Sequence, residues 1–135
     1  MPRFFILFTD KEIRAYRASV KQERMIPMMD TIQENEIFNL ADKVDYREGT
    51  FYPQAALRND KAELFLMAVD AGVLIPDHKA PSDLIFQALE GEAVIQINGV
   101  DHPVKKGDFL YMNKGTLHHL QVVSKFKFSM VRLYK

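Results

Sequence analysis

The stretch GEAVIQINGVDHPVKKG, residues 91–107, decides the fold class. Within it, the pair Asn98-Gly99 separates two short runs with strand character, residues 93–97 and 100–104. Asn-Gly is the strongest two-residue hairpin signal, because both residues tolerate the positive φ that such a turn requires. The stretch therefore predicts a β-hairpin.

The same alternation of short strands and turns extends outward from this hairpin. The further candidate strands are residues 51–57, 63–69, 84–90, 109–112, 117–123 and 126–134. The pairs Ala71-Gly72 and Pro76-Asp77 are interpreted as turns between the second and third of them. About eight strands with turn signals every 8 to 12 residues indicate a sandwich or a barrel rather than an α/β fold.

The N-terminal part of the chain has a different pattern. Thr9 and Glu12 fit a capping box that opens an apolar repeat of helical spacing, so we predict a helix over residues 10–24. An alternative is that the natural start is one of the methionines at 25, 28 and 29, and that the preceding residues add little. We expect a helical extension over residues 1–36 and a β domain over residues 37–135.

Composition excludes several classes of function. Eighteen basic residues balance eighteen acidic ones, which argues against non-specific binding to nucleic acid. The absence of cysteine rules out disulfides, thiolate nucleophiles and zinc-thiolate sites, and it favours a cytoplasmic location. The longest apolar run near the N-terminus, residues 4–8, is too short to span a bilayer, so no membrane association is expected.

Glycines and histidines fall into two spaced motifs, G-x5-H-x-H-x3-E-x6-G and G-x5-P-x-G-x2-H-x3-N. The matching positions are Gly72, His78 and Gly91 in the first motif, and Gly107, Gly115 and His118 in the second. On these residues the chain resembles the cupin superfamily. The resemblance implies an all-β fold, an antiparallel double-stranded β-helix of the cupin or jelly-roll type, preceded here by the short N-terminal helix.

Four motif positions depart from the family pattern, where this chain has Ala80, Leu84, Asn113 and Val122. Cupins usually hold a divalent transition metal such as Mn, Fe, Ni or Zn with four ligands, and only His78 and His118 remain of that set. Two imidazoles make a weak metal site, because such ions ordinarily take at least three protein ligands. The nearby candidates Asp77, Asp83 and His119 are strand neighbours of inward positions, so regular alternation turns them to the other face.

The same positions predict a pocket. We expect His78 and His118 to point into one cavity inside the barrel, with Leu84, Phe86 and Leu120 as apolar walls that contact a ligand. Buried imidazoles need hydrogen-bond partners, and a shared water, ion or ligand would supply them.

Three functions remain open from sequence. The first is a small cupin that binds a small molecule, or alternatively a metal ion, without an assigned activity. The second is a metal-dependent enzyme of the dioxygenase or isomerase type, so enzymatic activity is left undecided. The third is a ligand-free structural dimer. A homodimer is expected in any case, because residues 63–69 are apolar on both faces and need cover outside the barrel.

Overall fold

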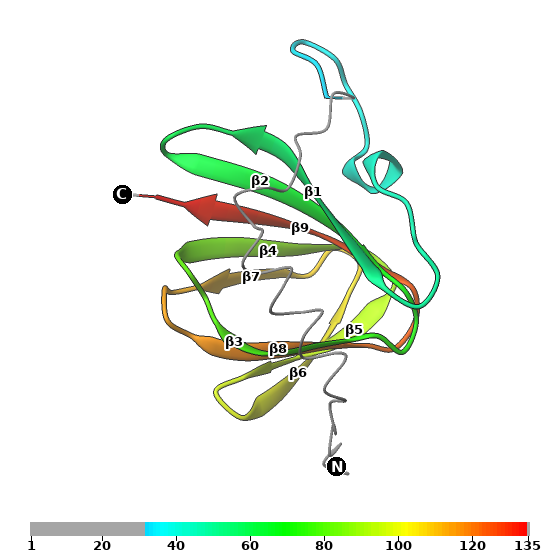
Figure 1. Ribbon diagram of the computed structural model, residues 1–135, viewed down its shortest axis with the longest axis vertical. Coiled ribbons are helices and arrows are strands. Elements are labelled where there is room, and N and C mark those ends of the chain that lie inside the picture. The colour runs from blue at the N-terminus through cyan, green and yellow to red at the C-terminus, as the bar shows by residue number, and fades with distance from the viewer. Residues whose placement is uncertain (1–31, 135) are drawn as a thin grey trace.

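The computed structural model describes residues 32–134 of the 135-residue chain (Figure 1). The helix expected over residues 10–24 lies outside this range. Inside it, helical structure is confined to one 3-10 turn, η2 (Leu40–Lys43), which corrects the expected helix-then-barrel order for this part of the chain. Among the described residues, no helix is long and apolar enough to cross a membrane.

Nine strands make up the rest of the described fold. They are β1 (Phe51–Arg58), β2 (Ala62–Val69), β3 (Leu74–Lys79), β4 (Asp83–Glu90), β5 (Glu92–Ile97), β6 (Val100–Lys105), β7 (Phe109–Met112), β8 (Leu117–Val122) and β9 (Phe126–Leu133). The all-β prediction is confirmed. A five-stranded antiparallel sheet, β1-β2-β9-β4-β7, faces a four-stranded one, β3-β8-β5-β6, and the two do not join into a closed barrel (Figure 1).

The core lies between the two sheets. Its largest members are the rings of Phe86, Phe126 and Phe128 from the five-stranded sheet, which pack within 6.1 Å of one another between centroids. Ile95 and Leu120 meet them from the four-stranded sheet. Strand β9 shows why the sequence folds this way, since a period of two places its aromatic residues on the inner face.

The central hairpin forms as predicted. Asn98 and Gly99 have φ angles of 49° and 85°, and they join Ile97 of β5 to Val100 of β6. Gly91, at the start of the same region, has a φ of +81°, and a Cβ there would lie 1.9 Å from the carbonyl oxygen of Lys125. Only glycine fits this position.

Strand β3 corrects one prediction. The sequence of Pro76-Asp77 indicated a turn, yet both residues lie within this strand, which is an edge of the four-stranded sheet. Ile75 pairs with Leu120 and His78 pairs with His118, so two residues face one across the ladder, as in a β-bulge. Proline is tolerated at an edge or a bulge because no ladder hydrogen bond from its nitrogen is required there.

The outer face of the five-stranded sheet is covered in part by the chain itself. Val44 packs with Leu66 and Ala68 of β2, and the ammonium of Lys127 donates a 2.6 Å hydrogen bond to the carbonyl of Ala41. The segment that contains η2 therefore covers part of the outward apolar surface of the strand at residues 63–69.

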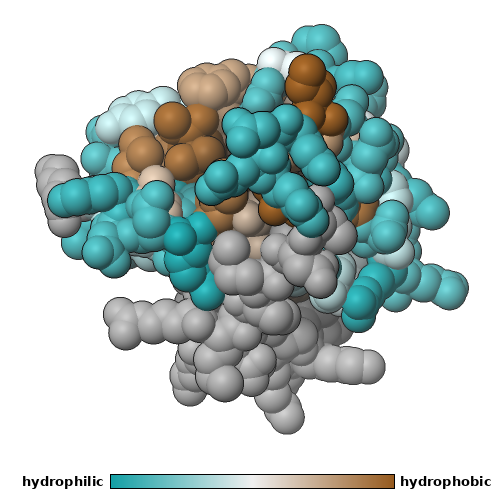
Figure 2. All heavy atoms as spheres, turned by 90° about the horizontal axis from the view of Figure 1, so that it is seen from above, coloured by the Kyte–Doolittle hydropathy of each residue, from teal (hydrophilic) through white to brown (hydrophobic). Residues whose placement is uncertain are grey.

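The remainder of that outer face carries an apolar ladder, one residue from each strand of the sheet in direct register. Its members are Leu57, Leu64, Val131, Ile85 and Tyr111. The two end members are 53% and 55% exposed. In the view from above, apolar residues are exposed on the left of the surface, among hydrophilic ones (Figure 2).

Candidate functional site

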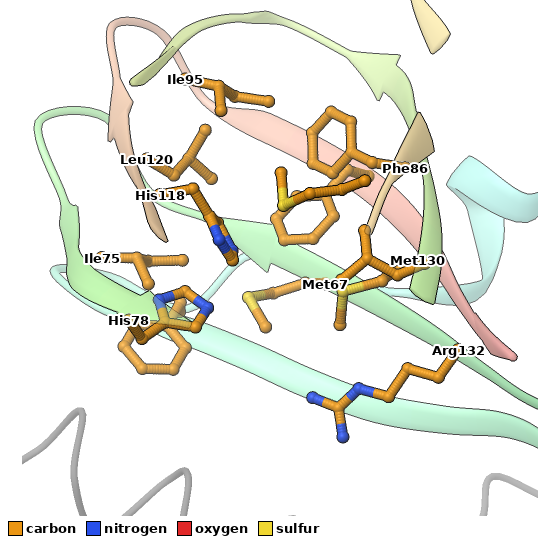
Figure 3. Close-up of a pocket in the computed structure, with 13 residues that line it drawn as sticks. Met67, Ile75, His78, Phe86, Ile95, His118, Leu120, Met130 and Arg132 are labelled. Carbon is orange, nitrogen blue, oxygen red and sulfur yellow. The ribbon is translucent and has the colours of Figure 1, made fainter. Parts of the chain in front are cut away.

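Two histidines meet at the inner face of the four-stranded sheet. His78 of β3 and His118 of β8 lie directly opposite each other in the ladder, with ring centroids 4.0 Å apart and planes tilted by 58°. Both rings point into the same cavity (Figure 3). The bulge at residues 76–77 makes this possible, because Ile75 also faces the cavity and strict alternation would turn a residue three places later to the other face.

Backbone carbonyls fix the tautomer of each ring. Nδ1 of His78 lies 3.0 Å from the carbonyl oxygen of Pro76, and Nδ1 of His118 lies 3.0 Å from that of Thr116. A carbonyl only accepts, so Nδ1 carries the proton and donates in both rings. In the neutral state, Nε2 is then the acceptor nitrogen of each imidazole.

Burial keeps the pair neutral. Loss of solvation, with the neighbouring His118 as a second cause, lowers the pKa of His78 to about 4. The pKa of His118 is also lowered, chiefly by its own burial. Near pH 7 the site therefore presents uncharged imidazoles.

Apolar side chains form the walls of the cavity. Leu84, Phe86 and Leu120, the residues expected to contact a ligand, all line it together with the two histidines. Further lining comes from methionines, among them Met67 and Met130 (Figure 3), and from aromatic rings such as that of Phe128. The cavity measures about 80 Å³. This volume suits a small ligand, from a few atoms up to the size of a small organic acid, rather than a large cofactor.

Among the lining residues that sequence reasoning missed, Arg132 is the charged one. It lies on β9, is 7% exposed, and places its guanidinium carbon 4.7 Å from the centroid of the Phe65 ring. The signal was present in the sequence, because the alternation that puts Phe126, Phe128 and Met130 on the inner face continues to position 132. A charged residue on an apolar face marks a candidate functional group.

The carboxylates near the histidines do not join them. Asp77 and His119 form their own pair on the other side of the sheet, with Nδ1 of the histidine 2.9 Å from a carboxylate oxygen. The side chain of Asp83 accepts a 2.8 Å hydrogen bond from the backbone N–H of Lys114. Their outward placement agrees with the strand alternation used in the sequence analysis.

The donor set does not by itself fit a tightly bound divalent metal. Within the described part of the chain, no three His, Cys, Asp or Glu side chains come together in a way that could hold an ion. Ala80 and Leu84, which stand where the family has ligands, are buried apolar residues, and Arg132 adds a positive charge to the lining. A bound cation would be held by only two imidazole nitrogens, and it would lie near the like charge of Arg132.

These features define a class: a small protein of two facing antiparallel sheets, with an apolar internal cavity and a neutral histidine pair. A family model described as the Cupin domain matches residues 65–133, just over half of the chain. The chain belongs to this family, as its two glycine-histidine motifs indicated.

Solved structures support the same fold. A conserved protein of unknown function from Streptococcus pyogenes has a TM-score of 0.71 at 21% identity, covering 81% of this chain and 96% of that one. A cupin superfamily protein from Desulfitobacterium hafniense has a TM-score of 0.72 at 19% identity, covering 81% and 100%. A cupin 2 conserved barrel domain protein from Leptotrichia buccalis reaches 0.68 at 26% identity, covering 72% and 47%. No curated protein matches the sequence.

Proposed function

We propose that this cupin binds a small organic molecule in the cavity between its sheets. The observation that carries the proposal is the histidine pair, His78 and His118, set at 4.0 Å inside an otherwise largely apolar lining. Neutral imidazoles in such a place can orient a ligand by hydrogen bonds, while Leu84, Phe86 and Leu120 contribute apolar contact.

A thermal-shift screen of small organic acids, alcohols and amides tests this proposal. Compounds that raise the melting temperature of the wild type should lose most of that effect in His78→Ala and in His118→Ala. The double variant should add little, because one ligand is shared by both rings. A shift of melting temperature in the double variant equal to that of the wild type would contradict binding at the histidine pair. The matched control is His102→Ala, at an exposed histidine of β6.

A metal-dependent enzyme of the dioxygenase or isomerase type is the second candidate. It is favoured by one observation, that His78 and His118 stand at ligand positions of the family motifs and meet in the cavity. Elemental analysis of protein purified without a histidine tag separates the two candidates. Our proposal predicts less than stoichiometric Mn, Fe, Ni and Zn, and a stoichiometric amount of any of them would favour the enzyme.

We also propose a homodimer, formed through the apolar ladder on the outer face of the five-stranded sheet. The ladder crosses every strand of this sheet, and a second copy would present the same row to it. Face-to-face packing of two sheets is a common way to bury such a surface, and an isologous interface requires self-complementarity. The structural-dimer function expected as a third possibility rests on this surface alone.

A further inference from the structure

A second polar pair, Asp77 and His119, lies behind the histidine pair on the outer face of the four-stranded sheet. Nδ1 of His119 on β8 lies 2.9 Å from a carboxylate oxygen of Asp77 on β3, and it donates because an ionised carboxylate only accepts. The carboxylate is the exposed member, whereas His119 is buried. Each strand thus contributes one residue to the cavity, His78 or His118, and its chain neighbour to this outer pair.

The outer pair spans the β-bulge that turns His78 into the cavity. The pairing of β3 with β8 is fixed before the bulge, where Ile75 lies opposite Leu120. It is fixed again just after β3, where the N–H of Ala80 donates a 3.0 Å bond to the carbonyl of Thr116. The step from Ile75 to Ala80 is one residue longer than the step from Thr116 to Leu120, so one extra residue has to be accommodated between these points.

The place of this extra residue decides which side chains face the cavity. In the observed arrangement, Pro76 and Asp77 together lie opposite the single residue His119, and His78 returns to the inner face opposite His118. With the extra residue two places later, Asp77 would face the cavity and His78 would turn outward. Both arrangements leave the two ends of the segment in the same register.

The outer pair favours the observed arrangement. Asp77 and His119 have to lie on the same face to form their hydrogen bond, so moving the extra residue would break it. The move would also take the carboxylate, whose side chain is 55% exposed, into a mostly apolar cavity lining, where a charge is costly. The bond and the hydration of the carboxylate therefore both keep the bulge at residues 76–77.

The bulge also orients one of the two cavity rings. Nδ1 of His78 lies 3.0 Å from the carbonyl oxygen of Pro76, which belongs to the bulge. The tautomer of His118 is instead fixed by Thr116, which precedes it on the same side of the pairing. A change in the bulge should therefore alter the ring of His78 and spare that of His118.

Resting on the proposed function, we propose that Asp77 and His119 are positioning residues for the ligand cavity. Their hydrogen bond holds the bulge from the outer face, and the bulge sets the direction and the tautomer of His78. Neither side chain lines the cavity, so both act through that histidine. A partly exposed ion pair contributes little to the stability of a whole domain, and its effect here is a local choice between two places for one residue.

Nitrogen-15 NMR of the imidazole rings at pH 7 tests this inference without any ligand. In Asp77→Ala, the ring of His78 should lose its single tautomer with the proton on Nδ1, and its nuclear Overhauser contacts to the ring of His118 should disappear. The amide hydrogens of residues 75–79 should exchange about tenfold faster, because local opening becomes easier. His118 should keep its tautomer, which shows that the domain stays folded.

Further variants separate this local role from a general loss of structure. Asp77→Asn should keep the wild-type signals, because an amide oxygen accepts the same hydrogen bond. His119→Phe should reproduce the effect of Asp77→Ala. The matched control is Asp101→Ala, which removes a carboxylate that accepts a 3.0 Å bond from Gln96 on the same outer face, away from the bulge. This control should leave the ring of His78 unchanged.

An unchanged ring of His78 in Asp77→Ala, or the loss of a single tautomer in both cavity rings, would overturn this inference. Neither result depends on whether the cavity binds a small molecule, which the thermal-shift screen decides. A screen without any stabilising compound would contradict the proposed function, whereas the NMR result on the bulge would still hold.

Discussion

At the scale of single residues, two kinds of position define the fold and its cavity: glycines that the backbone geometry requires and polar groups that the cavity encloses. Gly91 represents the first kind. Its positive φ and its closeness to the Lys125 carbonyl leave no room for a side chain. The second kind is represented by His78, His118 and Arg132, which are the polar members of an otherwise apolar cavity lining.

Gly91→Ala should lower the free energy of unfolding by about 2–4 kcal/mol, because it combines backbone strain with a clash against backbone atoms. Gly99→Ala is the matched control, since its φ of +85° is similar and no atom lies within 4 Å of the added Cβ. That control should lose only about 1–2 kcal/mol. Urea unfolding of both variants checks the difference, and equal losses would contradict the steric argument.

The buried histidines predict a pH-dependent stability. Their pKa values are lower in the folded state than in the unfolded chain, where histidine titrates near 6.5, so the unfolded chain binds more protons below that pH. Stability should therefore be complete above pH 6.5 and decline as the pH falls toward about 4, the folded-state pKa of His78. The expected loss from this residue is up to about 3 kcal/mol.

Denaturant unfolding at a series of pH values checks this slope. In the double variant His78→Phe, His118→Phe, the decline between about pH 6.5 and 4 should be shallower than in the wild type. An unchanged slope would show that other groups cause the pH dependence.

At the scale of secondary-structure elements, the sequence predicted most strands because a period of two is visible in their side chains. Strand β9 alternates buried aromatic residues with polar ones, and β5 and β6 are separated by Asn98-Gly99. Strand β3 was missed because Pro76 is usually read as a break. Its tolerance there depends on the strand being an edge with a bulge, which only the sheet order reveals.

The candidate site was predictable to a similar extent. Spacing brought His78 and His118 to one cavity, and alternation named the walls Leu84, Phe86 and Leu120. Arg132 could have been found by extending the alternation of β9 to its end. The tautomers could not, because they depend on carbonyls of Pro76 and Thr116 that lie beside the rings only in the folded chain.

The apolar ladder makes a prediction at the scale of the five-stranded sheet. Sedimentation at micromolar concentration should give a dimer for the wild type and a monomer for Leu57→Lys combined with Tyr111→Lys, because two charges would be buried without partners. Val123→Lys, at a residue that is 60% exposed and outside the ladder, should remain dimeric. A wild-type monomer, or a double variant that stays dimeric, would contradict an interface on this face.

At the scale of the whole molecule, the two facing sheets act as a frame for one cavity. The four-stranded sheet supplies the histidines, and the five-stranded sheet supplies Arg132 together with the aromatic wall. A ligand between them contacts both sheets, so binding should raise the stability of the whole domain in proportion to ligand concentration and affinity.

Nitrogen-15 NMR of the imidazole rings tests whether the histidine pair binds a small molecule in this cavity. At pH 7, His78 and His118 should show neutral rings with the proton on Nδ1. Addition of a compound that raises the melting temperature of the wild type should shift the Nε2 signal of His118 and leave the signals of exposed His102 unchanged. A protonated ring at pH 7, the opposite tautomer, or a shift confined to His102 would contradict the account.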